Sequence, residues 1–232
     1  MINEHEKIQA FHLRHRIFCQ ELGWLRQTVN TVETDDYDAK AIFFGVFDRQ
    51  NNLLAFLRIT VNETPFMLEK DFVSLVMTGY KIRKECDTIE VSRFCVAPEA
   101  RNDIVSKNFG ACGISMLLYK GVYHWSIKHK KRYIYLVVEY KIYRLLRVRG
   151  FPCKLLGKPK KMPDGVIAVA AMMDWRAFEA LNFSKRPEML KWFNSLNSKP
   201  VSAFNQDQSV FPEWRLQRPG AGLRRQAFPE QS

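Results

Sequence analysis

Residues 41–61, AIFFGVFDRQNNLLAFLRITV, decide the fold of this chain. Two apolar runs, 41–47 and 53–61, are separated by the polar segment 48–52. A short polar segment between two such runs is typical of a β-hairpin. The stretch therefore predicts two antiparallel strands with a turn between them.

The segments around this hairpin alternate between helical and strand patterns. Residues 5–22 place apolar side chains at helical spacing and end before Gly23, which predicts an amphipathic helix. The remaining expected elements are a short helix over 71–77, a strand over 88–96, a mainly helical stretch over 108–129, a strand over 132–138, a helix over 140–149 and strands over 154–156 and 166–173. This order predicts an α+β fold with one central sheet.

The chain of 232 residues suits one domain with an appended tail. We expect the domain over residues 1–182 and a C-terminal extension over 183–232. The extension predicts a short helix near 186–196 followed by a largely extended basic tail.

The net charge of +12 is concentrated in one segment. Residues 120–161 hold thirteen Lys or Arg residues and one acid, Glu139. A basic surface indicates an anionic partner, and nucleic acid, an acidic carrier protein and the phosphates of coenzyme A all remain open. The sequence has no apolar run of the ~18 residues that a transmembrane helix needs, so we expect a cytoplasmic protein.

The thiol and imidazole side chains do not predict a metal site. The five cysteines are widely spaced and form no Cys-x-x-Cys pair, so they indicate neither a disulfide framework nor a zinc site. His12 and His15 are three residues apart on the predicted first helix, but no third ligand accompanies them. We expect no metal and no cofactor.

Three acids, Glu33, Asp35 and Asp38, lie within six residues of a predicted loop. An arbitrary acidic run is usually a solvated loop. Phe18 and Trp24 precede this run, however, and an aromatic surface near carboxylates suits a cation that carries an aromatic base. The run is therefore either solvated or one wall of a cation site.

Charged side chains also occur inside two predicted strands. Arg58 lies within an apolar strand, where a buried charge needs a partner, and an acid of the loop would be a natural one. In the strand over 88–96, Glu90, Ser92 and Phe94 are expected to face one way and Arg93 the other. A surface strand would show the same alternation.

Together these residues resemble the acyl-homoserine-lactone (autoinducer) synthase family, a branch of the GNAT acyltransferase superfamily. The resemblance covers about residues 7–180 and agrees in both identity and order. The family pattern runs Arg-x3-Phe-x5-Trp, then Glu-x-Asp-x2-Asp, then an arginine in the next hairpin, a Phe in a short helix and Glu-x2-Arg in a later strand. The matching residues are Arg14, Phe18, Trp24, Glu33, Asp35, Asp38, Arg58, Phe72, Glu90 and Arg93.

The resemblance implies a GNAT-like three-layer α/β/α sandwich with a central mixed, mostly antiparallel sheet. It also implies an acyltransferase that moves an acyl chain from acyl-ACP or acyl-CoA to the amine of S-adenosylmethionine. The acylated intermediate then lactonises and releases methylthioadenosine, which makes a quorum-sensing signal. We expect a monomer or weak dimer that binds S-adenosylmethionine and an acyl thioester rather than nucleic acid.

The resemblance also implies roles for single residues. Glu90, Arg93 and Asp35 would be catalytic, with Glu90 as the base. The residues implied in substrate binding are Arg14, Phe18, Trp24, Glu33, Asp38, Arg58, Phe72 and Leu136. Leu136 stands where members that prefer 3-oxo chains place a threonine, which favours an unsubstituted acyl chain.

The basic segment would receive the acyl donor in this interpretation. A cluster for steering an acidic carrier protein is expected at Lys141, Arg144, Arg147, Arg149 and Lys154. The glycine-rich stretch 109–113 is similar to the pyrophosphate loop of relatives that use coenzyme A, so acyl-CoA also remains open. The segment 137–139 resembles N-acyl amino acid synthases on the same fold, and such an acyltransferase is the alternative function.

Overall fold

A computed structural model of the chain describes residues 4–106, 112–195 and 213–216. The helices are α1 (Glu4–Arg14), η1 (His15–Glu21), η2 (Asp38–Lys40), α2 (Met67–Lys70), η3 (Val73–Leu75), η4 (Pro98–Ala100), α3 (Ser115–Lys128), α4 (Tyr140–Val148), α5 (Trp175–Lys185) and α6 (Pro187–Asn194). The strands are β1 (Ile42–Phe47), β2 (Leu53–Val61), β3 (Thr88–Val96), β4 (Ile104–Ser106), β5 (Cys112–Gly113), β6 (Tyr133–Glu139), β7 (Lys154–Leu155), β8 (Lys160–Lys161), β9 (Ile167–Asp174) and β10 (Glu213–Leu216).

The main sheet has the strand order β10-β1-β2-β3-β6-β9-β7, and β8 pairs with β9. β3 and β6 are parallel, whereas the other strand pairs of this sheet, among the residues that the structure describes, are antiparallel. The parallel register ends at Val91 and Leu136, although β3 continues to Val96 and β6 to Glu139. The two strands therefore separate within the sheet.

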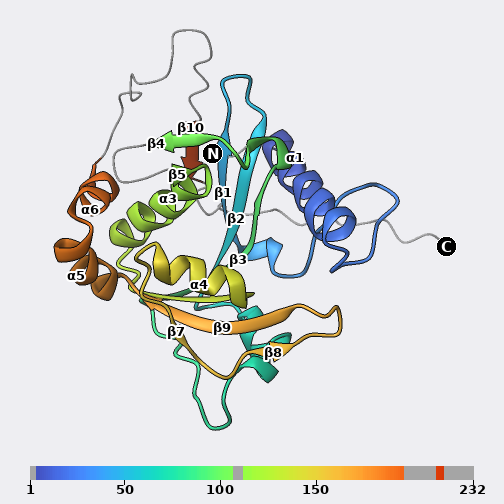
Figure 1. The fold of residues 1–232 in the computed structure, drawn as a ribbon. Helices are drawn as coiled ribbons and strands as arrows, with labels where there is room; N and C mark the ends of the chain where they lie inside the picture. The colour runs from blue at the N-terminus through green and yellow to red at the C-terminus, as the bar shows by residue number, and fades with distance from the viewer. Residues whose placement is uncertain (1–3, 107–111, 196–212, 217–232) are drawn as a thin grey trace.

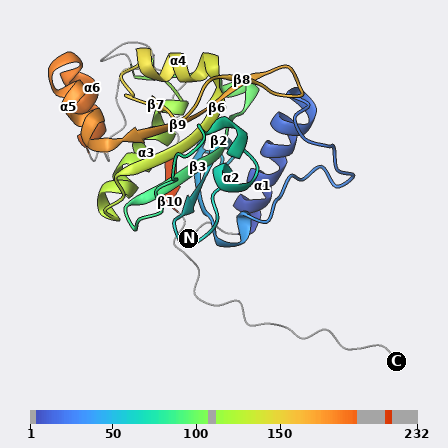
Figure 2. The same ribbon diagram turned by 90° about the horizontal axis from the view of Figure 1, so that it is seen from below.

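Helices cover both faces of this sheet. Successive residues of a strand point to opposite faces, and Phe43 contacts Phe11 of α1 whereas Phe44 contacts Trp125 of α3. Figure 1 shows β1 and β2 between α1 and α3. Figure 2 shows α4 and α2 on opposite sides of β6 and β9. The predicted three-layer α+β sandwich with a mixed, mostly antiparallel sheet is confirmed.

Two hydrophobic clusters form the core, one on each side of β6 and β9. The larger cluster joins the inner faces of α1, α3, α4, α5 and α6 to the sheet. The smaller cluster lies against α2 and η3 and contains Phe66, Leu68, Leu75, Tyr135, Leu156, Ala168 and Ala170. It places the first turn of α2 against the centre of the sheet.

Several predicted elements need correction. The short helix expected over 71–77 is displaced, since α2 ends at Lys70 and only Val73–Leu75 form a helical turn. The first helix continues past Arg14 as the π-helical segment η1, and Gly23 follows with a φ of 63°. α5 was not predicted, although Asp174 caps it by accepting a hydrogen bond from the Arg176 N–H.

The expected domain division after residue 182 falls inside α5. Beyond it, α6 packs into the larger core cluster through the buried side chains of Met189, Leu190 and Phe193. Within the expected tail, residues 213–216 pair antiparallel with β1.

Candidate active site

The acidic loop after Trp24 is folded onto the sheet. The Glu33 N–H donates to the Phe11 carbonyl of α1 at 3.1 Å, which fixes the start of the acidic run. Glu33 is buried, and the side chains of Asp35 and Asp38 are 18% and 11% exposed. The acidic run is therefore not a solvated loop.

Arg14 of α1 is a fully buried cation of the site. Its side chain has no exposed surface, and it lies against the rings of Phe11 and Phe56. Its Nε donates to Glu33 at 2.5 Å and its Nη1 to Asp38 at 2.7 Å. Burial alone would raise the pKa of the Asp38 carboxyl, but the hydrogen bond and charge of Arg14 outweigh it and lower that pKa below its usual value.

Arg58 of β2 approaches the same acids from the sheet. Its guanidinium is fully buried and contacts Asp35 and, at 2.6 Å, Asp38. Its Nε donates to the Ser92 hydroxyl at 3.0 Å. The acid partner that the sequence led us to expect for Arg58 is therefore present.

Arg93 reaches these acids because β3 contains a bulge. Arg93 has a φ of 53°, and the register to β2 shifts between Phe56 and Arg58. Its Nη2 lies 3.1 Å from Glu33 and 2.7 Å from Asp35. The prediction that Arg93 would face away from Glu90 and Ser92 was wrong, because it assumed unbroken alternation.

Phe94 is displaced by the same bulge. Its ring stacks on Tyr119 of α3 at 5.5 Å, on the opposite face from Glu90 and α2. The expected shared face of Glu90 and Phe94 was therefore also wrong.

The three acids and three arginines balance in charge. Each arginine contacts at least two of the carboxylates, and the side chains are at most 18% exposed. A buried ion needs such pairing because its removal from water is costly. We call these six residues the ion cluster: Arg14, Glu33, Asp35, Asp38, Arg58 and Arg93.

Glu90 lies beside the ion cluster in a different environment. Its carboxylate is 2% exposed and accepts hydrogen bonds from the Met67 N–H at 2.7 Å and the Leu68 N–H at 2.8 Å. Burial raises the pKa of Glu90 to about 7, although these two hydrogen bonds and Arg58 act in the opposite direction. Such a carboxyl can take up or release a proton near neutral pH.

An aromatic pair borders the ion cluster on the side of η1. The rings of Phe18 and Trp24 stack with their centroids 6.1 Å apart, and the guanidinium carbon of Arg93 lies 5.8 Å from the Phe18 ring. Phe18 is buried, whereas Trp24 is 37% exposed. The Trp24 ring can therefore meet a ligand from solvent.

The remaining expected substrate residues lie outside the ion cluster. Phe72 is half-buried against the smaller core cluster. Leu136 is half-buried against the larger core cluster, on the opposite face of the sheet from Glu90. A ligand that touched both Leu136 and the ion cluster would have to pass between the separating ends of β3 and β6.

The expected docking residues form a basic surface on and after α4. Lys141, Arg144, Arg147 and Lys154 are exposed and Arg149 is half-buried. Two of them are partly engaged, since Lys141 pairs with Glu139 at 2.7 Å and Arg147 donates to the Tyr143 hydroxyl at 3.1 Å. Of the glycine-rich stretch 109–113, residues 109–111 lie outside the described residues.

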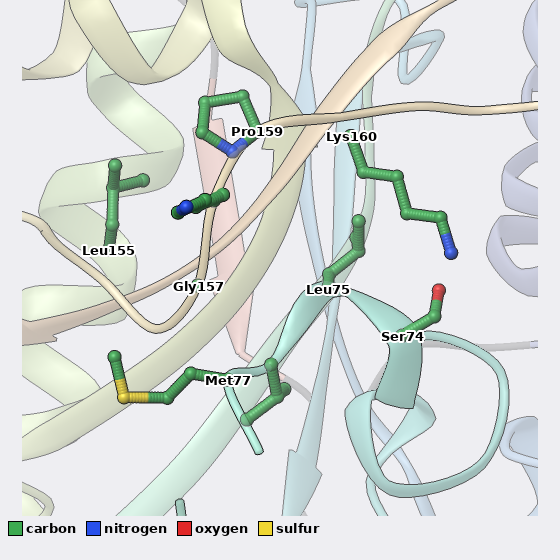
Figure 3. A pocket seen from close by; sticks show the side chains of 9 residues that line it. Ser74, Leu75, Met77, Leu155, Gly157, Pro159 and Lys160 are labelled. Carbon is green, nitrogen blue, oxygen red and sulfur yellow. The ribbon is translucent and has the colours of Figure 1, made fainter.

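A separate pocket of about 570 Å³ lies between η3 and the segment that joins β7 to β8 (Figure 3). Leu75, Val76 and Met77 line one side, and the rest of the lining is Ser74, Leu155, Gly157, Lys158, Pro159 and Lys160. None of the ion-cluster residues lines it.

Sequence reasoning missed the residues that connect the ion cluster to Glu90. Met67 and Leu68 bind Glu90 through main-chain N–H groups, and the sequence does not reveal such contacts because any residue except proline has this group. The ring of Tyr37 lies over Arg58, with the guanidinium carbon 5.4 Å from the ring centroid. The position of Tyr37 between Asp35 and Asp38 in the sequence could have identified it as a neighbour of the site.

His12 and His15 are engaged with the backbone of the loop that follows them. His12 Nδ1 lies 2.9 Å from the Thr31 carbonyl, and His15 Nε2 accepts from the Thr28 N–H at 3.3 Å. No group of three potential metal ligands occurs among residues 4–106, 112–195 and 213–216. In that same part of the chain, no helix is long and apolar enough to cross a membrane.

The sequence and the fold of this chain are similar to those of known proteins. The family model described as autoinducer synthase matches residues 1–180. An acyl-homoserine-lactone synthase of Vibrio anguillarum is 26% identical over 66% of this chain and 77% of its own length. A probable acyl-homoserine-lactone synthase of Sinorhizobium fredii is 24% identical over 76% of this chain and 84% of its own length.

A solved structure shows that the fold is shared. A CoA-dependent acyl-homoserine lactone synthase, determined with MTA, superposes with a TM-score of 0.65 at 22% identity and covers 78% of this chain and 82% of its own. Since the family model spans well over half of the sequence, the chain belongs to the autoinducer synthase family.

Proposed function

We propose that this protein is an acyl-homoserine-lactone synthase. It would transfer an acyl chain from an acyl thioester to the amine of S-adenosylmethionine, and the carboxylate of the product would then displace methylthioadenosine to close the lactone. The observation that carries this proposal is Glu90, a buried carboxyl with a pKa of about 7 beside the ion cluster. Family membership supports the same reaction.

Glu90 serves as the base of the acyl transfer. The amine must lose a proton before it attacks the thioester, and a base is most effective when its pKa is near the working pH. Because Glu90 is almost fully buried, the proton would pass either directly from a bound amine or through one water. The Met67 and Leu68 N–H groups hold the carboxylate in place for this step.

The sulfonium donor binds at the exposed edge of the ion cluster. Trp24 offers an aromatic face for a cation, and Asp35 and Arg93 retain 18% and 14% of their side-chain surface. Arg14 has none, so we assign it the positioning of Glu33 and Asp38 in place of direct contact with the donor carboxylate. Arg58 likewise positions Asp35 and Asp38.

We propose that the thioester binds where β3 and β6 separate. Pairing between the two strands ends at Val91 and Leu136, and backbone N–H groups of β3 beyond this point would polarise the carbonyl oxygen. The acyl chain would then extend toward Leu136 on the face covered by α3 and α4. Leu136 has no hydroxyl, which favours an unsubstituted acyl chain.

The basic surface of α4 suits an acidic acyl carrier protein. Opposite charges steer such a partner during encounter without being part of the chemistry. We propose acyl-ACP as the donor that uses Arg144 and Lys154, which are exposed. An acyl-CoA donor needs less of this surface, and one solved relative is described as CoA-dependent.

The alternative is an N-acyl amino acid synthase on the same fold. Such an enzyme acylates an ordinary amino acid and has no need of a site for a cationic nucleoside donor. Trp24 and the neighbouring ion cluster favour S-adenosylmethionine.

Mass spectrometry of lipids from the medium of an expressing bacterium tests the proposal. It reports the head group and the acyl chain together. We expect N-acyl-homoserine lactones that disappear with the Asp35→Asn variant. Acylated amino acids with a free carboxylate, dependent on the same residue, would favour the alternative.

A further inference from the structure

Met67, the first residue of α2, contacts both the ion cluster and Glu90. Its side chain is 7% exposed. Its sulfur lies 3.1 Å from Nη2 of Arg58 and 3.7 Å from Nη1 of Arg93. The thioether therefore lies between the two sheet arginines of the ion cluster.

Among the described residues, Nη2 of Arg58 and Nη1 of Arg93 have no oxygen as a hydrogen-bond partner, whereas the other nitrogens of both side chains do. Arg58 directs Nε to Ser92 and Nη1 to Asp35 and Asp38. Arg93 directs Nε and Nη2 to the acids of the loop. The sulfur thus gives an acceptor to the one nitrogen of each guanidinium that has no oxygen partner in the described part of the chain, and these guanidiniums have little or no access to water.

The main chain of the same residue binds Glu90. The Met67 N–H donates to Glu90 Oε2 at 2.7 Å. Met67 therefore contacts the proposed base through its main chain and Arg58 and Arg93 through its side chain. Glu90 hydrogen-bonds to Met67 and Leu68 and to neither arginine, so Met67 is the direct link between them.

We propose that Met67 is a positioning residue that sets the distance and alignment between Glu90 and the two arginines of the ion cluster. This inference rests on the proposed function, since it assigns Met67 a role in the acyl transfer. Met67 acts through Glu90 and the arginines and does not itself touch the reacting atoms.

The chemistry of sulfur suits this position. The thioether is a weak, neutral acceptor, so it meets two cationic donors without adding a fourth negative charge to a cluster of three acids and three arginines. Leucine has a similar volume and no acceptor. Glutamine has a similar length and a carbonyl acceptor, so it can restore the contact.

Two other charged side chains act on Glu90. Arg58 of β2 lowers its pKa, and Glu69 of α2 raises it. Burial, and to a smaller extent the charge of Glu90, in turn raises the pKa of Tyr37. Leucine at position 67 leaves these groups in place but frees the first turn of α2 from the arginines. We therefore expect the Glu90 carboxylate to lose part of its hydrogen bonding and of its attraction to Arg58, and its pKa to rise.

The test compares Met67→Leu, Met67→Gln and Met189→Leu in the pH dependence of kcat/KM for S-adenosylmethionine. Met189 is a buried methionine of α6 in the larger core cluster, so its variant controls for the loss of a buried thioether. We expect Met67→Leu to lower kcat/KM by about tenfold and to move the acidic limb to higher pH, because charged donors lose their acceptor. Met67→Gln should recover both, and Met189→Leu should match the parent protein.

Three results would overturn the inference while the proposed function stands: an active Met67→Leu with an unshifted profile, an equal defect in Met67→Gln, or an equal defect in Met189→Leu. If circular dichroism shows that Met67→Leu does not fold, Met67→Gln alone tests the inference. A kcat/KM and a pH profile of Met67→Gln unlike those of the parent would then contradict the role of Met67 as an acceptor. A parent protein that releases no methylthioadenosine would instead count against the proposed function.

Discussion

Arg58 and Asp38 form a buried ion pair, with Nη1 and Oδ1 2.6 Å apart. The arginine comes from the middle of β2 and the aspartate from η2, so this pair holds the acidic loop against the sheet. The side chain of Arg58 has no exposed surface and that of Asp38 is 11% exposed. The shape of the proposed donor site therefore depends on interactions that also stabilise the fold.

Loss of Arg58 should destabilise the protein strongly. Arg58→Ala leaves Asp35 and Asp38 buried with fewer cations, and breaking such a pair costs about 3–5 kcal/mol. The free energy of unfolding, measured with urea, should fall by this amount. The control is Arg16→Ala, because Arg16 pairs with Glu99 at 2.9 Å in a half-exposed bridge that contributes about 0–1 kcal/mol. Equal losses in the two variants would show that the ion cluster is not a stabilising unit.

Asp35 and Arg93 should be needed for turnover more than for folding. Both retain some exposed surface beside Trp24, and in either variant Arg14 still pairs with Glu33 and Asp38 and Arg58 with Asp38. We expect Asp35→Asn and Arg93→Ala to lose measurable turnover while their near-ultraviolet circular dichroism resembles that of the parent. Near-normal rates in both variants would place the reaction elsewhere.

Trp24 should contribute to donor binding. Its ring stacks on Phe18 and is 37% exposed, so Trp24→Ala removes an aromatic face without opening the core. A cation–π contact of ~0.5–2 kcal/mol corresponds to a rise in KM for S-adenosylmethionine of about two- to thirtyfold, with kcat little changed. Val29→Ala is the control, since Val29 is fully exposed in the same loop. An unchanged KM in Trp24→Ala would exclude this role.

Activity should rise with pH as Glu90 loses its proton. The base must be ionised to accept a proton from the amine, and burial raises the pKa of Glu90 to about 7. The acidic limb of kcat against pH should therefore have its midpoint near 7. Glu90→Gln should have little activity at any pH, and full activity in this variant would remove Glu90 from the mechanism.

The same carboxyl should affect stability with a defined sign. The pKa of Glu90 in the folded protein lies above its ordinary value of 4.5, so its contribution to stability is fully present below pH 4.5 and is lost as the pH rises through about 7. The free energy of unfolding of the parent, relative to that of Glu90→Gln, should therefore decrease between pH 4.5 and 7.5. An increase over this range would mean that Glu90 is stabilised as the anion.

Charge reversal on α4 should show whether acyl-ACP or acyl-CoA depends on the basic surface. Arg144→Glu removes a basic side chain from the proposed docking surface and should raise KM for acyl-ACP, most clearly at low salt. The KM for acyl-CoA should change less. Lys128→Glu, at the end of α3, is the control for net charge because Lys128 is also exposed. An equal effect of both variants would point to total charge in place of a docking surface.

The sequence was informative where one side-chain pattern determines one local structure. The hairpin over 41–61 and the strand over 88–96 were predicted with nearly the observed bounds, because alternation and turn residues are local signals. The acids and arginines of the ion cluster could be listed from the family pattern that the sequence resembles. Their mutual contacts could not, because they depend on how β2, β3 and α1 meet.

The errors have local physical causes. The bulge at Arg93 reverses the expected direction of two side chains, and a single strained residue leaves the apolar pattern of β3 intact. The link through Met67 was invisible because one half of it is a main-chain N–H group. α5 was missed although Asp174 is a favourable capping residue that begins it, which was a usable signal.

The most direct measurement is the release of methylthioadenosine by the purified protein supplied with an acyl thioester. Chromatography of the reaction should show one methylthioadenosine for each free thiol when S-adenosylmethionine is present, and neither product with Asp35→Asn. Free thiol with an ordinary amino acid such as tyrosine, and no methylthioadenosine with S-adenosylmethionine, would contradict the proposed function.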